Sequence, residues 1–280
     1  ANPIRAVGNI EEWLGVICKE QQITMKDICR NCAADSAAAS NDIKSLRSFV
    51  DNYIAQFALL GIQLMWNTDV HTALEQCKIK KTAVKEANTH QLHVLQELSS
   101  WCLKDLGSKP NRKKIETLVT IHVHQRDIAQ EMLQLYKAKK ISDALDFEWQ
   151  KQARNSWRPD MGDECNADGA SLFSVTDVDF TYQYEYLGTK ERLVVTPLTD
   201  RCYISLAQAL GMYFGGAPAG PAGTGKTETV KDMGRTLGIW VVVTNCTDQQ
   251  SYLDCAKIFK GLCQGGLWGC SDEFDRIILP

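Results

Sequence analysis

One stretch decides the fold of this chain: Gly220-Pro221-Ala222-Gly223-Thr224-Gly225-Lys226-Thr227. It fits the pattern G-x-x-x-x-G-K-[ST], in which glycines let successive backbone N–H groups turn inward around an anion. A helix expected to begin near Lys226 directs the positive end of its dipole at the same place. Lys226 is then placed to reach the β- and γ-phosphates of a nucleotide, and Thr227 to ligate Mg²⁺. A Gly/Pro-rich loop between a strand and a helix is the alternative reading of these eight residues.

A second stretch supplies the acidic half of such a site. Residues 267–271 form a short apolar-to-neutral run that suits a buried parallel strand. The strand ends at the acidic pair Asp272 and Glu273. This position delivers Asp272 to the metal and Glu273 to the attacking water. The two stretches together predict a nucleoside triphosphate site.

Length and charge narrow the class of protein. A chain of 280 residues with 44% hydrophobic residues can fill the cores of two domains. Its net charge of −3 and its lack of a basic block argue against nucleic acid and anionic membranes as partners. No stretch has the apolar length of a transmembrane helix, and residues 1–5 lack the order of a signal peptide. We expect a soluble, cytosolic protein.

The eleven cysteines predict free thiols rather than a disulfide framework. Their number is odd, their spacing is irregular, and they lie within apolar helical patterns. Cys29 and Cys32 are three residues apart, a spacing that places them on one face of a helix and does not require a metal. His122 and His124 would lie on different faces of a helix, which favours core and surface positions over a ligand pair.

Helical periodicity dominates the chain from residue 41 to about residue 154. A long amphipathic helix is expected to begin there, with residues 40–42 as N-cap candidates. A second helix covers the apolar positions from 84 to 106 and ends at residues 107–110. A third begins near residue 112, and a short fourth covers residues 142–153. Because these helices carry no catalytic constellation, they predict a scaffold, a lever or an interaction module.

The pattern changes near residue 170. Residues 159–169 are polar and contain glycine, so we interpret them as a linker. Alternation from residue 178 to 186, followed by residues 193–195, predicts a hairpin or a pair of strands. The sequence then predicts a helix over 199–210 and a strand, loop and helix around the phosphate loop. After these it predicts a strand at 240–244, a helix at 252–261 and the strand ending at Asp272. This order predicts a parallel sheet with right-handed crossovers.

Four longer strings carry a family resemblance: LVVTPLTDRCY at 193–203, GGAPAGPAGTGKTET at 215–229, NCTD at 245–248 and WGCSDEF at 268–274. In this order they resemble the start of the first AAA+ module of dynein heavy chains. Residues 175–188 and 264–268 look most like axonemal outer-arm heavy chains of the gamma type. The resemblance implies a helical bundle segment, the C-terminal part of the linker, over residues 1–170. Residues 171–280 would then be the first part of an α/β P-loop AAA+ sheet, truncated at Pro280.

The resemblance assigns a role to each matching position. Lys226 would bind the β/γ-phosphates, Thr227 and Asp272 would hold Mg²⁺, and Glu273 would polarise the hydrolytic water. Asn245 resembles the polar residue that can hold the catalytic glutamate away from water, although an asparagine that caps a buried strand is an equal alternative. The remaining nucleotide contacts would come from Gly220, Pro221, Ala222, Gly223, Thr224, Gly225 and Glu228, with Val194, Val195, Pro197 and Leu198 along the adenine. Core packing is the alternative for those last four.

Three positions depart from the family pattern. Ser271 stands where the family usually has Phe, Asp275 where it has Asn, and Ile278 where it has an acidic residue. Ser271 would lose aromatic burial beside the metal ligand. Asp275 would bring a third carboxylate near Asp272 and Glu273, which favours either proton uptake or tighter metal binding.

The resemblance implies a mechanochemical ATPase with ATP or ADP and Mg²⁺ as cofactors, acting in the axoneme of a cilium or flagellum. Its partners would be the remaining AAA+ modules of the same heavy chain, intermediate and light chains, and a microtubule contacted by a distant stalk. The alternative is a structural module that binds nucleotide without turnover. Because the chain stops before the sensor residues and arginine finger of the family, we expect it to bind nucleotide better than it hydrolyses it.

Overall fold

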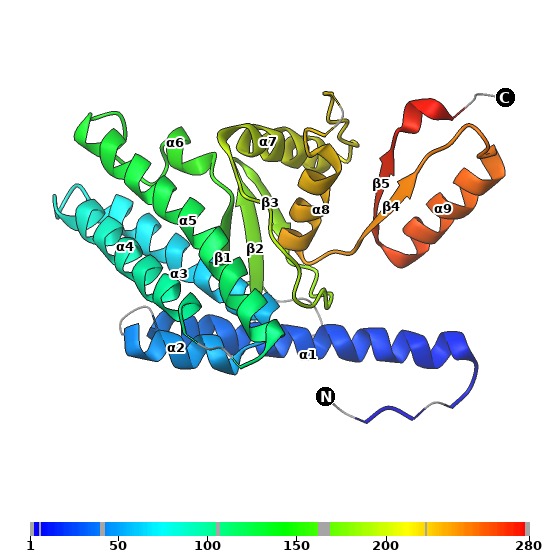
Figure 1. The fold of residues 1–280 in the computed structure, drawn as a ribbon, viewed down its shortest axis with the longest axis horizontal. Helices are drawn as coiled ribbons and strands as arrows, with labels where there is room; N and C mark the ends of the chain where they lie inside the picture. The colour runs from blue at the N-terminus through cyan, green and yellow to red at the C-terminus, as the bar shows by residue number, and fades with distance from the viewer. Residues whose placement is uncertain are drawn as a thin grey trace.

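The computed structural model describes residues 3–5, 7–39, 43–104, 107–161, 169–221 and 223–277. Figure 1 shows a group of helices, an antiparallel sheet beside it and a strand–helix–strand unit near the C-terminus, which confirms the predicted fold class. The helices are α1 (Ile10–Ala39), α2 (Ile43–Asn52), α3 (Ala55–Gln76), α4 (Ala83–Cys102), α5 (Lys109–Lys137), α6 (Phe147–Gln150), α7 (Pro197–Gly211), α8 (Lys226–Leu237), α9 (Tyr252–Gly265) and the 3₁₀ turn η1 (Phe274–Arg276). The strands are β1 (Arg154–Arg158), β2 (Ala170–Val175), β3 (Val178–Thr181), β4 (Val241–Asn245) and β5 (Trp268–Asp272). No described helix is long and apolar enough to cross a bilayer.

Helix α1 precedes the first helix predicted from the sequence. It runs along the lower edge of the molecule beneath the other helices (Figure 1). Its first half exposes apolar residues such as Leu14 and Ile17, whereas its second half buries Met25, Cys29 and Cys32. The two cysteines share the buried face, as their spacing predicts, and the Cys32 thiol donates to the carbonyl of Phe57 at 3.1 Å.

The single helix predicted from residue 41 is wrong, because the chain breaks between α2 and α3. Ile54 has an extended backbone, with φ −63° and ψ 154°. The buried ammonium of Lys114 on α5 donates to the carbonyls of Val50 and Tyr53 at the end of α2. These carbonyls lack intrahelical partners at a helix C-terminus, and a cation there also complements the helix dipole. The predicted caps at residues 40–42 lie outside the described residues.

Helices α4 and α5 meet where the sequence predicts a stop. Gly107 has a positive φ of 68°, and the Ser108 hydroxyl accepts from the N–H of Asn111 at 3.4 Å, which caps α5. The two helices pack side by side (Figure 1). His122 of α5 is buried between them, with Nε2 3.1 Å from the carbonyl oxygen of Gln91. The core position expected for this histidine is therefore confirmed.

The antiparallel sheet has the order β1-β2-β3. The predicted helix over 142–153 is wrong beyond α6, because the Asp146 carboxylate accepts from the N–H of Ser142 and of Asp143 and closes a turn there. The following residues form β1, which pairs Arg154 with Ser174 of β2. This pairing joins residues before and after position 170 in one sheet. The domain boundary expected at that position stays a prediction. Of the predicted linker, residues 162–168 lie outside the described part of the chain.

Strand alternation predicted up to residue 186 ends at Thr181, and residues 193–195 do not form a strand. Tyr182 and Tyr184 turn into the helical core instead, with ring centroids 5.3 Å apart. The side chain of Gln56 on α3 holds this segment by three hydrogen bonds: Nε2 donates to Tyr182 Oη at 2.7 Å and to the Glu185 carbonyl at 2.8 Å, and Oε1 accepts from the Leu187 N–H at 2.9 Å. We call residues 182–187 the join.

The other side of the join contacts the end of α8. The N–H groups of Gln183 and Glu185 donate to the carbonyls of Leu237 and Gly238, at 3.0 and 3.1 Å. Gly238 has φ 68°, and a Cβ there would lie 2.5 Å from the Tyr182 ring. Only glycine suits both the backbone conformation and the close approach. The join therefore lies between α3 and α8.

The parallel pair β4 and β5 confirms the predicted parallel sheet, with Asn245 opposite Asp272. Helix α9 crosses between them, but buries no residue within the described chain. The strand expected before the phosphate loop is absent, since residues 212–221 have no regular structure. Figure 1 shows the unit of β4, α9 and β5 at the side of the molecule away from the α3–α5 helices.

We expect all eleven cysteines to react with an alkylating reagent after denaturation without reduction. The described cysteines are free thiols. Burial raises the pKa of Cys29 to about 12, so this thiol should stay protonated and unreactive until the chain unfolds. Mass spectrometry before and after denaturation measures this. Exposed Cys18 and Cys202 should label in the native protein; a mass lower by bridged pairs would contradict the prediction.

Candidate nucleotide site

The phosphate loop has the backbone that its glycines predict. Gly223 and Gly225 have φ of 79° and 82°, a region that residues with a Cβ rarely adopt. Gly225 is the N-cap of α8, which begins at Lys226 as expected and has no side-chain cap. The first N–H groups of α8 therefore remain available to an anion at the positive end of the helix dipole. Ala222 lies outside the described residues.

Lys226 is bound by its own loop. Its Nζ donates to the carbonyl of Gly220 at 2.7 Å and to that of Pro221 at 2.9 Å. The Thr224 hydroxyl donates to the Pro221 carbonyl at 2.9 Å. The ammonium is thus directed back across the loop, towards the space that the loop encloses. A phosphate oxygen entering this space would exchange neutral carbonyl partners for an anionic one, which binds an ammonium more strongly.

Thr227 and Asp272 lie together although they are far apart in sequence. The Thr227 hydroxyl donates to Asp272 Oδ2 at 3.1 Å. Helix α8 supplies the threonine in its first turn, and β5 supplies the aspartate at its last residue. The Cys246 N–H holds the Asp272 carbonyl at 2.9 Å, which fixes the end of the strand. A hydroxyl and a carboxylate are hard oxygen ligands, so this pair fits Mg²⁺.

Glu273 is exposed and has the left-handed backbone φ of 53°. Its Oε2 accepts from Nε of Arg276 at 2.9 Å. Asn245 is also exposed, and among the described residues no hydrogen bond joins it to Glu273. The sequence analysis did not identify Arg276. The available signal was its position three residues after Glu273, because side chains at that spacing meet in a helical turn.

The departures from the family pattern can be located in part. Ser271 is an exposed residue of β5, and Asp275 is exposed within η1. Within the described chain, neither hydrogen bond nor ion pair joins Asp275 to Asp272 or to Glu273. Ile278 lies outside the described residues.

The segment expected along the adenine precedes α7. Val194 is 69% exposed and Leu198 is 73% exposed, so core packing does not explain these two residues. Val195 is half-buried, and Pro197 is exposed at the first position of α7. Thr196 caps the helix by a reciprocal pair of hydrogen bonds with Thr199.

A buried ion pair joins this segment to the phosphate-loop helix. Arg192 Nε donates to Asp232 Oδ1 at 2.7 Å, and Asp232 on α8 is completely buried. The hydroxyl of Tyr203 on α7 donates to Asp232 Oδ2 at 2.7 Å, and the Leu193 N–H donates to Oδ1 at 3.2 Å. Burial alone would raise the pKa of Asp232, but the Arg192 guanidinium and these donors hold it below the usual value.

Sequence reasoning also missed this network. The available signal was the charged residue Asp232 on the face of α8 that also carries apolar Met233. In the structure this face is buried, with Thr229, Asp232, Met233 and Thr236 among its residues. Because Arg192 and Leu193 both bind Asp232, the segment that follows them is fixed relative to α8. The ion pair therefore sets the position of the exposed residues 194–198 relative to the phosphate loop.

Comparisons with known proteins show which family this chain is similar to. Residues 182–280, which include all the site residues discussed, match the family described as "Hydrolytic ATP binding site of dynein motor region". The chain is 48% identical over 278 residues, 99% of its length, to "Dynein axonemal heavy chain 5" of Rattus norvegicus. It is 48% identical over 279 residues, 100% of its length, to "Dynein axonemal heavy chain 8" of Homo sapiens. It is 46% identical over 277 residues, 99% of its length, to "Dynein gamma chain, flagellar outer arm" of Chlamydomonas reinhardtii. It spans only 8%, 6% and 6% of the length of these three relatives, respectively.

Proposed function

Because this chain belongs to the dynein heavy chain family, we propose that residues 171–280 are the first part of an AAA+ motor module and that residues 1–170 are the linker segment before it. The module binds ATP or ADP with Mg²⁺. In a complete ring it hydrolyses ATP to move the linker and slide axonemal microtubules. The words "axonemal" and "flagellar outer arm" in the names of the relatives support a cilium or flagellum as its location.

One observation carries the proposal: the hydrogen bond of 3.1 Å between Thr227 and Asp272 beside the phosphate loop. The loop N–H groups and Lys226 would bind the phosphates, and the Thr227 and Asp272 oxygens would hold Mg²⁺. The metal, when bound, neutralises charge on the transferred phosphoryl group. Glu273 would orient and polarise water after release from Arg276, with Asn245 as an alternative partner for its carboxylate. The exposed side chains of Val194 and Leu198, with Val195 and Pro197, would contact the adenine.

The contacts of the join support movement of the helical segment with the nucleotide site. Gln56 of α3 holds the join from one side, and the end of α8 holds it from the other. The phosphate loop lies at the opposite end of the same α8. A shift of α8 on nucleotide binding would therefore act directly on residues bound to α3. The other AAA+ modules, the stalk that contacts the microtubule, and the intermediate and light chains are the partners we propose for the whole heavy chain.

A structural module without turnover is the second candidate. The observation that favours it is the ion pair of 2.9 Å between Glu273 and Arg276, which occupies the carboxylate that would polarise water. The two candidates differ in whether Glu273 is released from this pair when the site is complete.

Glu273→Gln distinguishes the two candidates in a heavy chain that contains the whole motor ring. We expect ATP binding to remain and steady-state phosphate release from this site to fall about 100-fold or more, because the amide loses the charge that polarises water. Asp275→Asn is the matched control, since it removes a nearby exposed carboxylate and should change turnover little. Equal turnover by the wild-type chain and the Glu273 variant would favour the structural module.

A further inference from the structure

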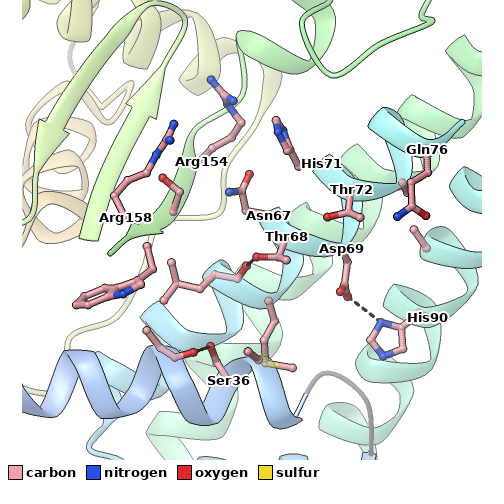
Figure 2. A pocket seen from close by; sticks show the side chains of 18 of the residues that line it. Ser36, Asn67, Thr68, Asp69, His71, Thr72, Gln76, His90, Arg154 and Arg158 are labelled. Atoms are coloured by element: carbon pink, nitrogen blue, oxygen red, sulfur yellow. Dashed lines mark hydrogen bonds and ion pairs between the residues drawn. The ribbon is translucent and has the colours of Figure 1, made fainter. Parts of the chain in front are cut away.

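A cavity of about 1160 Å³ opens between α1, α3, α4 and β1. Figure 2 shows side chains from these elements around it, and no residue of the candidate nucleotide site lines it. Small side chains explain the hollow, because the three helices present alanines towards it: Ala33 and Ala37 from α1, Ala73 from α3, and Ala83 and Ala87 from α4. We call this cavity the helical groove.

Arg154 of β1 gives the helical groove a buried cation. The residue is only 9% exposed, and its Nε is buried with no hydrogen-bond partner in the described structure. One guanidinium nitrogen, Nη2, donates to Gln150 Oε1 at 2.6 Å, and the group lies 6.0 Å from the centre of the Trp149 ring. No carboxylate of the described chain forms an ion pair with it. Asp179 acts on this charge only from beyond ion-pair distance. A buried guanidinium without a directly paired anion is costly, so this position favours an anionic partner.

Arg158 extends this cationic wall. Residues 154, 156 and 158 lie on one face of β1 by strand alternation, and all three line the helical groove. Figure 2 shows the guanidinium groups of Arg154 and Arg158 pointing to the same side of the groove. Arg158 is exposed, so it is accessible from solvent.

Most of the carboxylates that line the groove already bind neighbouring side chains. Asp69 is bound by His90 Nδ1 at 2.9 Å and by Gln91 Nε2 at 2.8 Å. Glu86 is bound by Lys80 and by the Thr82 hydroxyl. Asp160 is the remaining carboxylate, and it is exposed. Among the described residues, the two arginines therefore leave the β1 side of the groove with positive charge that no direct ion pair neutralises.

The α3 wall of the groove contains a buried acceptor that has no donor in the described structure. Asn67 on α3 is 8% exposed, and its Oδ1 is buried without a partner in the described structure. A buried amide oxygen without a donor costs free energy, and native structures usually satisfy such groups. The helical groove thus presents unused donors on β1 and an unused acceptor on α3 (Figure 2).

We propose that the helical groove binds an acidic polypeptide segment from outside these 280 residues. A glutamate or aspartate side chain meets Arg154 and Arg158, and a backbone N–H of the segment donates to Asn67 Oδ1. A polypeptide supplies a side-chain anion and a backbone N–H donor at separate points of one chain, whereas inorganic phosphate carries its charge and its O–H donor on one small ion. The volume of the groove also exceeds what a single inorganic anion fills, and its alanine walls leave room for the segment's apolar side chains.

The test compares two libraries of twelve-residue peptides on the immobilised chain. Both libraries have the same mixture of small and apolar residues, and they differ only in carrying Glu or Gln at two fixed positions. We expect about tenfold greater retention of the Glu library, because charge-assisted pairing with guanidinium is lost in the Gln library. Arg158→Gln should remove this preference. Arg112→Gln, which changes an exposed arginine of α5 outside the groove, should leave it unchanged.

Arg158 is used for the main test because Arg154 is buried and its replacement can disturb the sheet. Equal retention of the two libraries, or an unchanged preference in Arg158→Gln, would overturn the proposal. A third arm repeats the retention measurement in inorganic phosphate and in sodium chloride of equal ionic strength, and compares the Glu preference in the two salts. Selective loss of the Glu preference in phosphate would show a small-anion site and contradict a polypeptide ligand, whereas equal loss in both salts supports it.

Discussion

Lys226→Ala is expected to abolish binding of Mg-ATP, with an affinity loss of about 100-fold or more. In the proposed site the ammonium is the charge of the phosphate loop that would reach the β- and γ-phosphates, and charge-assisted hydrogen bonds to phosphate are the strong ones. Its contacts with the carbonyls of Gly220 and Pro221 show that it already lies across the loop. Isothermal titration calorimetry of the chain with Mg-ATP measures the loss.

Lys231→Ala is the matched control for this experiment. Lys231 lies on the same helix and pairs with exposed Glu228 at 2.6 Å, so its removal takes away an equal charge without touching the loop. We expect its affinity for Mg-ATP to stay within a few-fold of wild type. Unchanged ATP affinity in Lys226→Ala would mean that the loop does not bind phosphate through this residue.

Asp232→Ala is expected to destabilise the chain by about 3–5 kcal/mol, the cost of leaving one charge of a buried ion pair unpaired. Arg192, Tyr203 and the Leu193 N–H would all lose their partner. Urea unfolding followed by circular dichroism measures the change. Glu228→Gln on the exposed face of the same helix should change stability by less than about 1 kcal/mol.

A double variant makes the cause of this loss testable. Arg192→Met with Asp232→Leu removes both charges, and we expect it to recover much of the stability that Asp232→Ala loses. The sign of the pH dependence follows from the lowered pKa of Asp232. Its stabilising contribution is complete above the ordinary value of 3.8 and is lost as the pH falls through the folded-state value. Equal stability of Asp232→Ala and wild type would show that the pair contributes nothing.

The sequence predicted the nucleotide-binding half of the fold better than the helical half, for physical reasons. Local backbone requirements come from the glycines of the phosphate loop and from the run before Asp272. Residue order therefore predicts α8, β4 and β5, and it predicts that Asp272 lies at the end of a strand beside the loop. The break between α2 and α3 depends instead on Lys114, which comes from a distant helix. Apolar periodicity continues through the break and gives no sign of it.

Two other features were hidden for different reasons. Strand β1 reads Arg-Asn-Ser-Trp-Arg, which lacks the apolar alternation by which short strands are identified. The pair of Arg192 and Asp232 joins residues far apart in the sequence, and spacing rules describe only neighbours along one element. The direction of Lys226 towards loop carbonyls, and the pairing of Glu273 with Arg276, likewise required coordinates.

The hold of Gln56 on the join has a mechanical consequence. A pull that separates α3 from α8 loads three hydrogen bonds of one side chain in parallel, with the buried Tyr182 ring packed against Gly238 behind them. Bonds loaded in parallel share the force, so the connection is stiff under small loads and fails in one cooperative event instead of lengthening gradually. The join is thus a stiff connection between α3 and α8, to which one glutamine side chain contributes three hydrogen bonds.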